Sequence, residues 1–377
     1  MSVLIAVDKF KGSLSQSQIS EIVSTFLDSI GIESAAIPLA DGGDGSVTAL
    51  ISLGWQRKTI TVVGPLDDSH EAAYAVSADG KTVALEVAEL CGIKYLNGKT
   101  NPWQASSSAV GQAIKEINPA QYKELLICVG GSASVDGGVG ILQALGVNVF
   151  NRKTKTVPGG LTGLMQIRDL DFKAASQIRK KIFGDCRVTV LSDTENPLLG
   201  SKGAVFAFGK QKGLNLVNRI RAELAMRRWF QLCRKNLADL DCNQKGTGSA
   251  GGIGFVFHAF LGAQIISGAQ YFLEQSNAAA KLENSTMLIT GEGRIDKTTL
   301  SGKGPYPLLK MAQQFNIPAV LICGSAEANT LQQLKKDFPI AGVISLENSG
   351  LEMSQLMSDA SQVLKQELAR NYSKEWK

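Results

Sequence analysis

The sequence predicts an α/β protein in which both chain ends build one doubly wound parallel-sheet domain, with a second, mixed α/β domain inserted between them. Strand and helix patterns alternate through residues 2–53 and again through the C-terminal part of the chain. The region between them opens with short alternating strands, which indicate an antiparallel meander. At 377 residues, the chain exceeds what one hydrophobic core usually organises. We expect one domain from residues 1–60 and 271–377, and the inserted domain from residues 61–270.

The N-terminal elements follow from apolar spacing and helix-cap signals. Ser2–Val7 is a short apolar run typical of a buried strand, and residues 33–39 form the second strand. Between the two strands, Ser15 and Gln18 have the spacing of a capping box, and apolar residues then recur at helical spacing until Gly31. A further helix, over residues 47–53, completes a βαβα opening.

The remaining elements separate into the insert and the end of the chain. The insert is predicted to hold strands at 59–63, 72–77, 82–87, 124–129 and 187–191, with a basic helix at 214–236. We interpret the arginines of that helix as a solvated face, because no aromatic or glycine pattern typical of nucleic-acid binding accompanies them. Strands at 287–289, 319–323 and 341–346 alternate with helices. Together with the first two strands they make a five-stranded sheet.

Composition excludes several classes of function. The hydrophobic content is 44% and the charged content 19%, both ordinary for a globular enzyme, and the net charge of +5 is too diffuse to indicate nucleic-acid binding. Six isolated cysteines, none in a CxxC pair, favour buried reduced thiols and a cytoplasmic protein. Two histidines leave little material for histidine-based metal sites. No stretch has the roughly 20 apolar residues of a membrane span.

One stretch, residues 290–305, has the character of a site-bearing loop. It follows the apolar run at 287–289, and Gly291 and Gly293 allow a sharp turn or a close approach to a ligand. Charged Glu292, Arg294 and Asp296 come next, where ligands bind in an open α/β sheet. The stretch fits neither the P-loop nor the dinucleotide fingerprint. An ordinary glycine-rich surface turn remains the alternative.

Five other loops after predicted strands are rich in glycine or aspartate. They span residues 8–13, 41–46, 130–138, 193–196 and 246–254. The loop at 130–138 precedes a helix, and its run of backbone N–H groups is a natural binding place for an anion. If these loops converge in a cleft between the domains, the site combines carboxylates, a few cations and many backbone donors. That combination suits phosphoryl transfer. A metal-dependent hydrolase or a sugar-binding module would share parts of it.

Seven segments, in order along nearly the whole chain, resemble the bacterial glycerate kinase family. They are DKFKGSLS (8–15), PLADGGDGS (38–46), GPLDD (64–68), GGSASVDGG (130–138), SDTENPLLG (192–200), GTGSAGGIG (246–254) and TGEGRIDKTTLSGK (290–303). The resemblance implies a flavodoxin-like domain with an inserted α/β domain and the active site in the cleft between them. It also implies ATP-dependent phosphorylation of D-glycerate, usually to 2-phosphoglycerate, with Mg²⁺, no nucleic-acid or membrane partner, and a homodimer left open.

The resemblance lets roles be assigned to individual residues as hypotheses. Asp193 or Asp296 is the general base, and both would contact Mg²⁺ carried with ATP; Lys11 and Asp8 complete the catalytic set. Acceptor binding is assigned to the following residues: Asp41, Gly42, Arg294, Lys303 and Ser13. Nucleotide phosphate binding is assigned to these: Gly130, Gly131, Ser132, Asp136, Gly137, Gly138, Gly291 and Gly293.

Several positions depart from the family pattern. Lys9, Val135, Thr298 and Ala109 do not preserve the chemistry of the residues expected there, whereas Asp44 keeps a charge and Ser46 a hydroxyl. If the first four line the acceptor pocket, the acceptor is in doubt. The alternatives are therefore a 3-phosphoglycerate product, another small hydroxy acid as acceptor, or a non-catalytic glycerate-binding or regulatory homologue.

Overall fold

The computed structural model describes residues 2–302 and 304–371, which divide into two compact units. The first unit combines residues 1–41 with residues 269–377, and the second is the continuous segment 42–268. The division at residue 41 places the helix at 46–52 in the second unit, and the expected boundary at residue 60 falls inside a strand of that unit.

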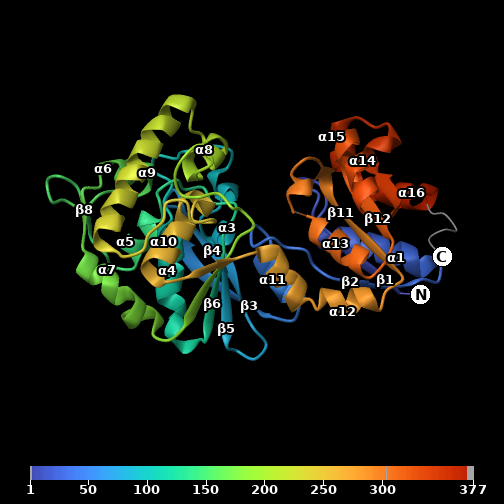
Figure 1. The fold of residues 1–377 in the computed structure, drawn as a ribbon, viewed down its shortest axis with the longest axis horizontal. Coiled ribbons are helices and arrows are strands. Elements are labelled where there is room, and N and C mark those ends of the chain that lie inside the picture. Colours follow the sequence, from blue (N-terminus) through green and yellow to red (C-terminus); the bar gives the residue numbers. More distant parts are fainter. Residues whose placement is uncertain (1, 303, 372–377) are drawn as a thin grey trace. The chain divides into compact units, whose positions relative to one another are not determined.

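The first unit is built on a five-stranded, wholly parallel sheet (Figure 1). Its strands are β1 (Ser2–Val7), β2 (Glu33–Ala36), β11 (Met287–Ile295), β12 (Ala319–Ala326) and β13 (Ile340–Ser345). Their order across the sheet is β2-β1-β11-β12-β13, which is the flavodoxin-like arrangement 2-1-3-4-5. The predicted five-stranded doubly wound sheet is confirmed.

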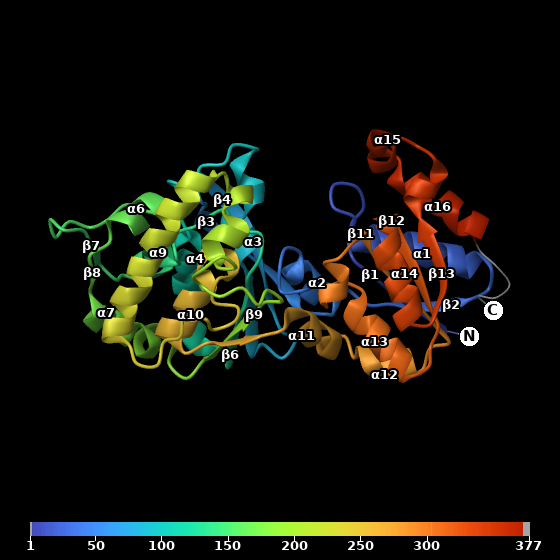
Figure 2. The ribbon, with the colours of Figure 1, turned by 45° about the horizontal axis from the view of Figure 1, so that its top comes forward.

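Helices cover both faces of this sheet. The helices of the unit are α1 (Gln16–Ser29), α11 (Gly268–Gln275), α12 (Ala278–Glu283), α13 (Tyr306–Gln314), α14 (Ala328–Asp337), α15 (Met353–Ser358) and α16 (Ala360–Asn371), with 3₁₀ turns η6 (Thr299–Ser301) and η7 (Leu346–Ser349). One hydrophobic cluster joins α1, α15 and α16 to one face, and another joins α11 to α14 to the other. Figures 1 and 2 show the blue N-terminal and orange C-terminal segments lying side by side. The Ser15–Gln18 capping box at the start of α1 is confirmed.

The second unit is built on a mixed sheet of six strands in the order β10-β9-β6-β5-β4-β3. These strands are β3 (Gln56–Val63), β4 (Ser69–Val76), β5 (Thr82–Glu86), β6 (Glu124–Cys128), β9 (Arg187–Leu191) and β10 (Gln264–Ile266). The first three form the predicted antiparallel meander, and the last four run parallel. The carboxyl ends of β5, β6, β9 and β10 therefore meet at one edge.

The other elements of the second unit surround this sheet in one continuous core. The helices are α2 (Ser46–Ser52), α3 (Val87–Cys91), α4 (Ser108–Ile117), α5 (Val139–Ala144), α6 (Gly160–Gln166), α7 (Phe172–Ile178), α8 (Ala204–Phe208), α9 (Leu216–Asn236) and α10 (Ile253–Leu261). Short turns are η1 (Ile93–Leu96), η2 (Pro119–Gln121), η3 (Arg179–Phe183), η4 (Lys210–Lys212) and η5 (Ser249–Gly251), and β7 (Val149–Phe150) pairs with β8 (Asp169–Leu170). No described helix is long and apolar enough to cross a membrane.

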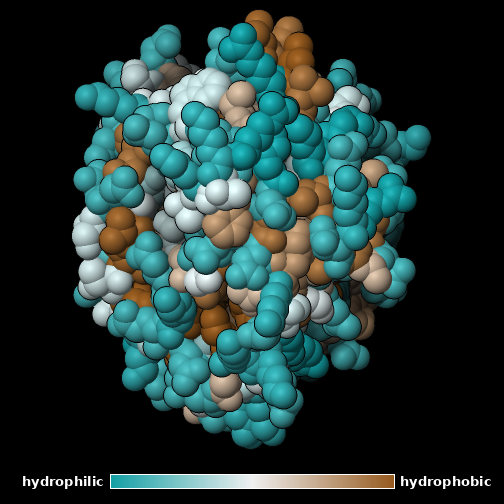
Figure 3. Space-filling view, turned by 90° about the vertical axis from the view of Figure 1, so that its left-hand side faces the viewer, coloured by the Kyte–Doolittle hydropathy of each residue, from teal (hydrophilic) through white to brown (hydrophobic). Residues whose placement is uncertain are grey.

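The exposed surface of helix α9 is less uniformly polar than the sequence suggested. Arg221, Arg227 and Arg228 are exposed, as a solvated basic face requires. Its first turns also expose large apolar side chains, those of Leu216, Val217, Ile220 and Leu224. Hydrophobic side chains gather at the N-terminal end of this helix, at the top of the face shown in Figure 3.

Strand β11 extends six residues beyond its predicted end, so residues 290–295, interpreted from the sequence as the start of a site-bearing loop, belong to the sheet. A Cβ atom on Gly291 would lie 1.7 Å from the carbonyl oxygen of Ile322 on the neighbouring β12, so only glycine allows the two strands to pair there. Because glycines are also typical of loops, the sequence of this segment resembles that of a loop. Sheet packing thus accounts for a glycine that the sequence suggested for phosphate binding.

We predict that Gly291→Ala will destabilise the first unit by about 3 kcal/mol, because β11 and β12 must separate to admit the methyl group. Native-state hydrogen exchange of the amides of β1 and β11 measures this loss as faster exchange. The control is Gly31→Ala, where a Cβ atom meets nothing within 4 Å but φ is +73°. It should cost only about 1 kcal/mol from left-handed strain. Equal losses in the two variants would contradict the packing explanation.

Candidate active site

The strand order of the first unit places acidic side chains at its ligand-binding edge. In a 2-1-3-4-5 sheet the connections on the two sides of the 1–3 pair run to opposite faces, and ligands bind beyond the carboxyl ends of those strands. Here the pair is β1 and β11, in register from Val3↔Met287 to Val7↔Gly291. Asp8 follows β1 directly, and its amide N–H donates to the Gly291 carbonyl at 2.8 Å. Glu292 is therefore next to this junction.

Asp8 is a half-buried carboxylate held by two donors. The amide of Lys9 lies 2.7 Å from Oδ1, and the Gln16 side-chain nitrogen lies 2.8 Å from the same atom. Burial raises the pKa of Asp8, and the negative charge of Asp41 raises it further, while the two hydrogen bonds oppose the shift. Two predicted site residues, Asp8 and Asp41, are thus within electrostatic reach of each other.

Glu292 is the most strongly perturbed carboxylate at this edge. Burial raises its pKa to about 7, with further increases from Asp8 and Asp296, while a hydrogen bond from Thr299 and the charge of Lys11 lower it. The Thr299 hydroxyl lies 2.6 Å from Oε1 of Glu292 and accepts from the amide of Asp296 at 3.2 Å. Because the Thr299 oxygen accepts from the Asp296 amide, its hydroxyl hydrogen is directed toward Glu292 as a hydrogen-bond donor. A carboxyl group with a pKa near neutrality is able to exchange protons at physiological pH.

Asp296 has the opposite character. The Thr298 hydroxyl and amide donate to its Oδ1 at 2.6 Å and 2.8 Å, and these bonds lower its pKa. Arg294 lies 3.7 Å from Oδ2 and also pairs with Glu327 at 3.4 Å. Asp296 is therefore a stable anion and a poor proton acceptor, in contrast to its neighbour Glu292.

The remaining predicted residues of the first unit lie around this cluster. Lys11 is exposed, and the Ser13 hydroxyl donates to the Phe10 carbonyl at 3.2 Å. Gly293 lies in β11, where a Cβ atom would be 3.1 Å from the Cα of Phe10, so it explains the close approach of the 8–13 loop. Lys303 lies outside the described residues.

The second unit brings its own predicted loops together at the carboxyl edge of its parallel strands. A Cβ atom on Gly130 would lie 2.6 Å from the Cα of Gly43, and one on Gly42 would lie 2.5 Å from the carbonyl oxygen of Leu191. The loops after β6 and β9 therefore contact the 42–46 loop directly. Gly42 has a φ of +77° and Gly131 one of +63°, both in the left-handed region that favours glycine.

The N–H groups of the 130–132 turn are available to a ligand. Within residues 2–302 and 304–371, no group accepts a hydrogen bond from the amides of Gly130, Gly131 or Ser132. Gly131 is exposed and Gly130 half-buried, whereas Ser132 is only 1% exposed. The backbone of the two glycines, more than the serine hydroxyl, therefore faces outward, and consecutive free N–H groups suit an anion.

Asp136, predicted to contact phosphate, points inward. It is fully buried, and its carboxylate accepts from the amide and hydroxyl of Ser107, each at 2.8 Å, and from the amides of Gly138 and Gly140 at 3.1 Å and 3.3 Å. Burial nevertheless raises its pKa. Its oxygens hold the turn in shape and leave no accessible surface for a phosphate.

Gly137 and Gly138 also have packing explanations. A Cβ atom on Gly137 would lie 2.9 Å from the ring of Trp229, whose indole N–H donates to the Gly137 carbonyl at 3.2 Å. One on Gly138 would lie 2.6 Å from Val256. Both residues have positive φ and let α9 and α10 pack against the turn.

Two buried charged residues of this unit escaped the sequence analysis. Glu86, 1% exposed at the end of β5, accepts from the amides of Gly45 and Val47, both at 2.9 Å, and so holds the start of α2. Burial raises its pKa to about 7. Lys212, 2% exposed, donates to the Ser132 hydroxyl at 2.8 Å and to the Ser134 carbonyl at 2.7 Å. In the sequence, Glu86 is only a charged residue beside an apolar strand, and Lys212 is only a charged residue in a glycine-rich turn. Neither pattern indicates a functional site.

Asp193 lies at the same edge, after β9. Its Oδ1 accepts from the hydroxyl of Ser267 at 2.7 Å, and Ser267 itself follows β10. The structure thus places the predicted carboxylates in two groups. Asp8, Asp41 and Asp296 belong to the first unit, and Asp193 belongs to the second.

Of the four positions that do not preserve the expected chemistry, two lie in the core and two lie nearer the surface. Val135 and Ala109 are fully buried in the hydrophobic core of the second unit, so apolar residues are explained there by packing and neither lines an open pocket. Thr298 is exposed and bonds Asp296, and Lys9 is half-buried beside Asp8. Only these last two are placed to affect the chemistry of the acidic cluster.

The described residues contain no cluster of three or more His, Cys, Asp or Glu side chains arranged to hold a metal ion. Magnesium usually binds through one or two carboxylates together with waters and substrate phosphates. The carboxylates present therefore suit an ion that arrives with a nucleotide.

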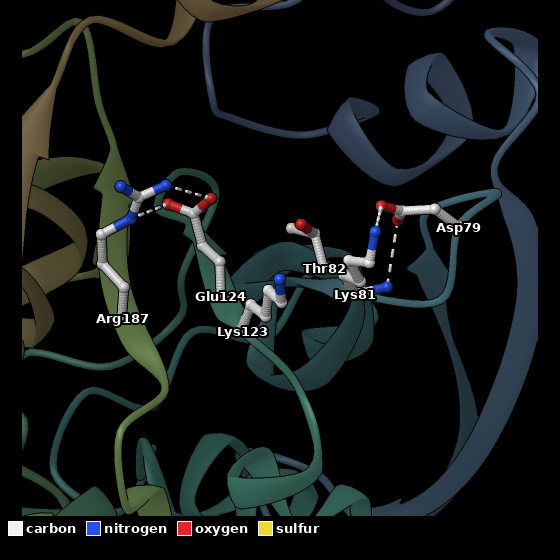
Figure 4. A pocket seen from close by; sticks show the side chains of 6 residues that line it. All are labelled: Asp79, Lys81, Thr82, Lys123, Glu124 and Arg187. Atoms are coloured by element: carbon white, nitrogen blue, oxygen red, sulfur yellow. Dashed lines mark hydrogen bonds and ion pairs between the residues drawn. The ribbon is translucent and has the colours of Figure 1, made fainter.

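A separate open pocket lies at the opposite, amino-terminal edge of the parallel strands of the second unit. It is lined by Asp79, Lys81, Thr82, Lys123, Glu124 and Arg187 (Figure 4). Arg187 forms two 2.9 Å hydrogen bonds to Glu124, and Lys81 lies 3.2 Å from Asp79. Its charges are therefore largely compensated by one another.

Comparison with known proteins gives one consistent result. The family model described as "Glycerate kinase family" matches residues 3–377. The chain is 31% identical to a glycerate kinase of Bacillus cereus over 382 residues, covering 100% of this chain and 98% of the relative. It is 32% identical to glycerate 2-kinase of Escherichia coli K12, covering 86% and 85%. A Salmonella typhimurium LT2 protein provisionally named glycerate kinase 2 superposes with a TM-score of 0.77 at 28% identity, covering 97% and 95%.

We predict that the Glu292 carboxyl titrates near pH 7 and that Asp8→Asn lowers its pKa, because the Asp8 charge disfavours ionisation of Glu292. Carbon-13 NMR of the Glu292 carboxyl measures both midpoints. Asp28→Asn, an exposed change on α1, is the matched control and should leave the midpoint unchanged. A Glu292 midpoint near 4.5 in the wild type would contradict the burial argument.

Proposed function

Because the chain belongs to the glycerate kinase family, we propose that it transfers the γ-phosphoryl group of ATP to the 2-hydroxyl of D-glycerate. Family membership makes the protein a phosphotransferase with an alcohol group as acceptor. The observation that carries the proposal is Glu292, a carboxyl group with a pKa of about 7 at the ligand-binding edge of a flavodoxin-ordered sheet.

Glu292 serves as the general base in this proposal, replacing Asp193 and Asp296 of the sequence hypothesis. As the acceptor oxygen bonds to the γ-phosphorus, its proton passes to Glu292, the bond from the γ-phosphorus to the bridging oxygen breaks, and ADP leaves. A base with a pKa near the working pH is both available and strong enough to accept that proton. The lowered pKa of Asp296 makes it a weaker base.

The neighbouring groups support binding of a small hydroxy acid. Lys11 is exposed close enough to Glu292 to affect its pKa, and Arg294 is about two-thirds exposed. Either cation can pair with the acceptor carboxylate or with the transferring phosphate. Asp8 and Asp41 offer acceptors for the remaining hydroxyl groups.

The 130–132 turn of the second unit is the proposed site of nucleotide phosphate. The unpaired N–H groups of Gly130 and Gly131 provide donors without the cost of reorganisation. Asp193 of this unit, or Asp296 of the first, would contact Mg²⁺ brought in with the nucleotide, and the ion would neutralise phosphate charge.

A coupled ADP-release assay over small hydroxy acids tests the function, with phosphorus NMR to identify the product. We expect D-glycerate to give the highest kcat/KM and the product to be 2-phosphoglycerate. A 3-phosphoglycerate product would overturn the regiochemistry alone. A different preferred acceptor would point to Lys9 and Thr298 as altered specificity positions. Binding of D-glycerate without ADP release would instead indicate a non-catalytic homologue.

We predict that Glu292→Gln lowers kcat by about 10²–10⁴-fold, the range typical of a lost general base, with a smaller change in KM. The kcat/KM of the wild type should rise with pH through about 7, because the deprotonated base is the active form. This limb should be absent from the residual activity of the variant. Asp193→Asn and Asp296→Asn, measured in parallel, should lower kcat less. A larger loss in either of those variants would return the role of base to that aspartate.

A further inference from the structure

Lys212 is a buried lysine with an unusual set of hydrogen-bond partners. Its side chain enters from η4, is 2% exposed, and places Nζ against two neutral oxygens, the Ser132 hydroxyl and the Ser134 carbonyl. Within the part of the chain that the structure describes, no carboxylate forms an ion pair with it. Burying an ammonium group without an ion pair is unfavourable, so its retention requires an explanation.

The position of Nζ connects it to the proposed anion-binding turn. Lys212 binds the 130–138 loop through Ser132 and Ser134, directly after the exposed Gly131. It also lies where a second glycine-rich loop approaches: a Cβ atom on Gly251 would be 2.2 Å from the Ser134 carbonyl oxygen and 3.2 Å from Nζ. The Gly137 amide donates to the Gly251 carbonyl at 3.0 Å. The ammonium thus lies where the two loops meet, and the residue is only 2% exposed.

The chemistry of an ammonium group fixes the hydrogen bonds in one direction. An ammonium only donates, so the Ser132 hydroxyl oxygen must accept from Nζ and direct its own proton elsewhere. The result is a turn in which the Gly130 and Gly131 amides have no acceptor among the described residues, while a buried positive charge is bonded to the next residue. An anion bound to the turn would add to the compensating charge of the buried Asp136.

We propose that Lys212 is a positioning residue for the anion site at Gly130–Gly131, holding the turn in its receptive shape and adding a positive potential beneath it. This inference rests on the proposed function, since it names the nucleotide phosphates as the anion. Lys212 acts through Ser132 and Ser134 and through its electric field, without touching the ligand.

The charged form of Lys212 is the form that matters, and its titration falls in an accessible range. Burial lowers the pKa of Lys212 to about 8, while interactions with Cys91 and Asp136 act to raise it. Burial raises the pKa of the Cys91 thiol to about 12 and also raises the pKa of the Asp136 carboxyl. Above pH 8 a neutral amine can still donate both hydrogen bonds but no longer supplies charge. The pH dependence therefore separates the electrostatic contribution from the hydrogen bonds.

Calorimetric titration of the full-length protein with ADP tests the proposal, because ADP binding requires no turnover. The terminal phosphate of ADP is already ionised above about pH 7.5, so its charge stays constant to pH 9.5. Lys212→Met should raise the Kd for ADP by about tenfold to a hundredfold at pH 7.5. At pH 9.5 the wild type should approach the variant, because both then lack the charge. Lys210→Met, in the same turn but exposed, is the matched control and should follow the wild type at both pH values.

The outcomes separate this proposal from the proposed function. A Lys212→Met variant with native near-ultraviolet circular dichroism and an unchanged Kd would overturn it. So would a ratio of Kd values that is the same at pH 7.5 and pH 9.5, because that result indicates hydrogen bonding alone. If Lys212→Met does not fold, the wild-type titration still decides, since an unchanged Kd across this pH range excludes a contribution from the charge. A wild type that binds ADP with the expected pH dependence but does not phosphorylate D-glycerate would overturn the function and leave the role of Lys212 intact.

Discussion

The pairing of β1 with β11 is the contact on which the candidate chemistry of the first unit depends. It joins the first strand of the chain to a strand 284 residues later, and the Thr290 hydroxyl reinforces it with a 2.6 Å bond to the Ala6 carbonyl. The register of this pair decides that Asp8 follows Val7 beside Gly291 and Glu292. A slip by one residue would turn Glu292 to the other face of the sheet and separate it from Asp8. The long sequence separation makes this contact slow to form and expensive in loop-closure entropy.

Carboxylates with raised pKa values occur in both units, and each has a specific cause. Glu292 and Glu86 reach pKa values of about 7 chiefly through burial. In both cases the folded protein binds the proton more tightly than the unfolded chain, whose glutamates titrate near 4.5. By linkage, the free energy of unfolding therefore falls as pH rises from about 4.5 to about 7, and changes no further through these groups above that range. Such a cost at neutral pH is typical of functional sites, where perturbed groups are kept for their chemistry.

Much of the fold could be predicted from the sequence because its elements are strongly periodic. The five strands of the first sheet, the meander and the Ser15 capping box were all visible as local patterns. The length of β11 was not, because Gly291 and Gly293 are typical of loops and their role depends on the closeness of β12 and the 8–13 loop. Which strands flank β11 could not be deduced from the local sequence alone.

The loops that carry the candidate site could be picked out from the sequence, but the environments of their side chains could not. The sequence drew attention to these loops through glycines and aspartates after predicted strands, because ligands bind beyond the carboxyl ends of parallel strands. It could not show that Thr298 holds Asp296 as an anion while burial gives Glu292 a neutral pKa, because both effects depend on the fold. Lys212 and Glu86 were missed for the same reason. Their partners lie 80 and 41 residues away in the sequence.

The two units differ in the charge around their candidate groups. Glu292 of the first unit has a pKa that is raised chiefly by burial and further by the charges of Asp8 and Asp296. The same negative charges beside a triphosphate would repel it. The second unit instead has unpaired backbone N–H groups at Gly130 and Gly131, a buried lysine bonded to the next residue, and Asp136 directed to internal donors. In the proposed reaction, the base and the phosphate-binding turn have separate surroundings, so that the pKa of the base is raised without weakening the anion site.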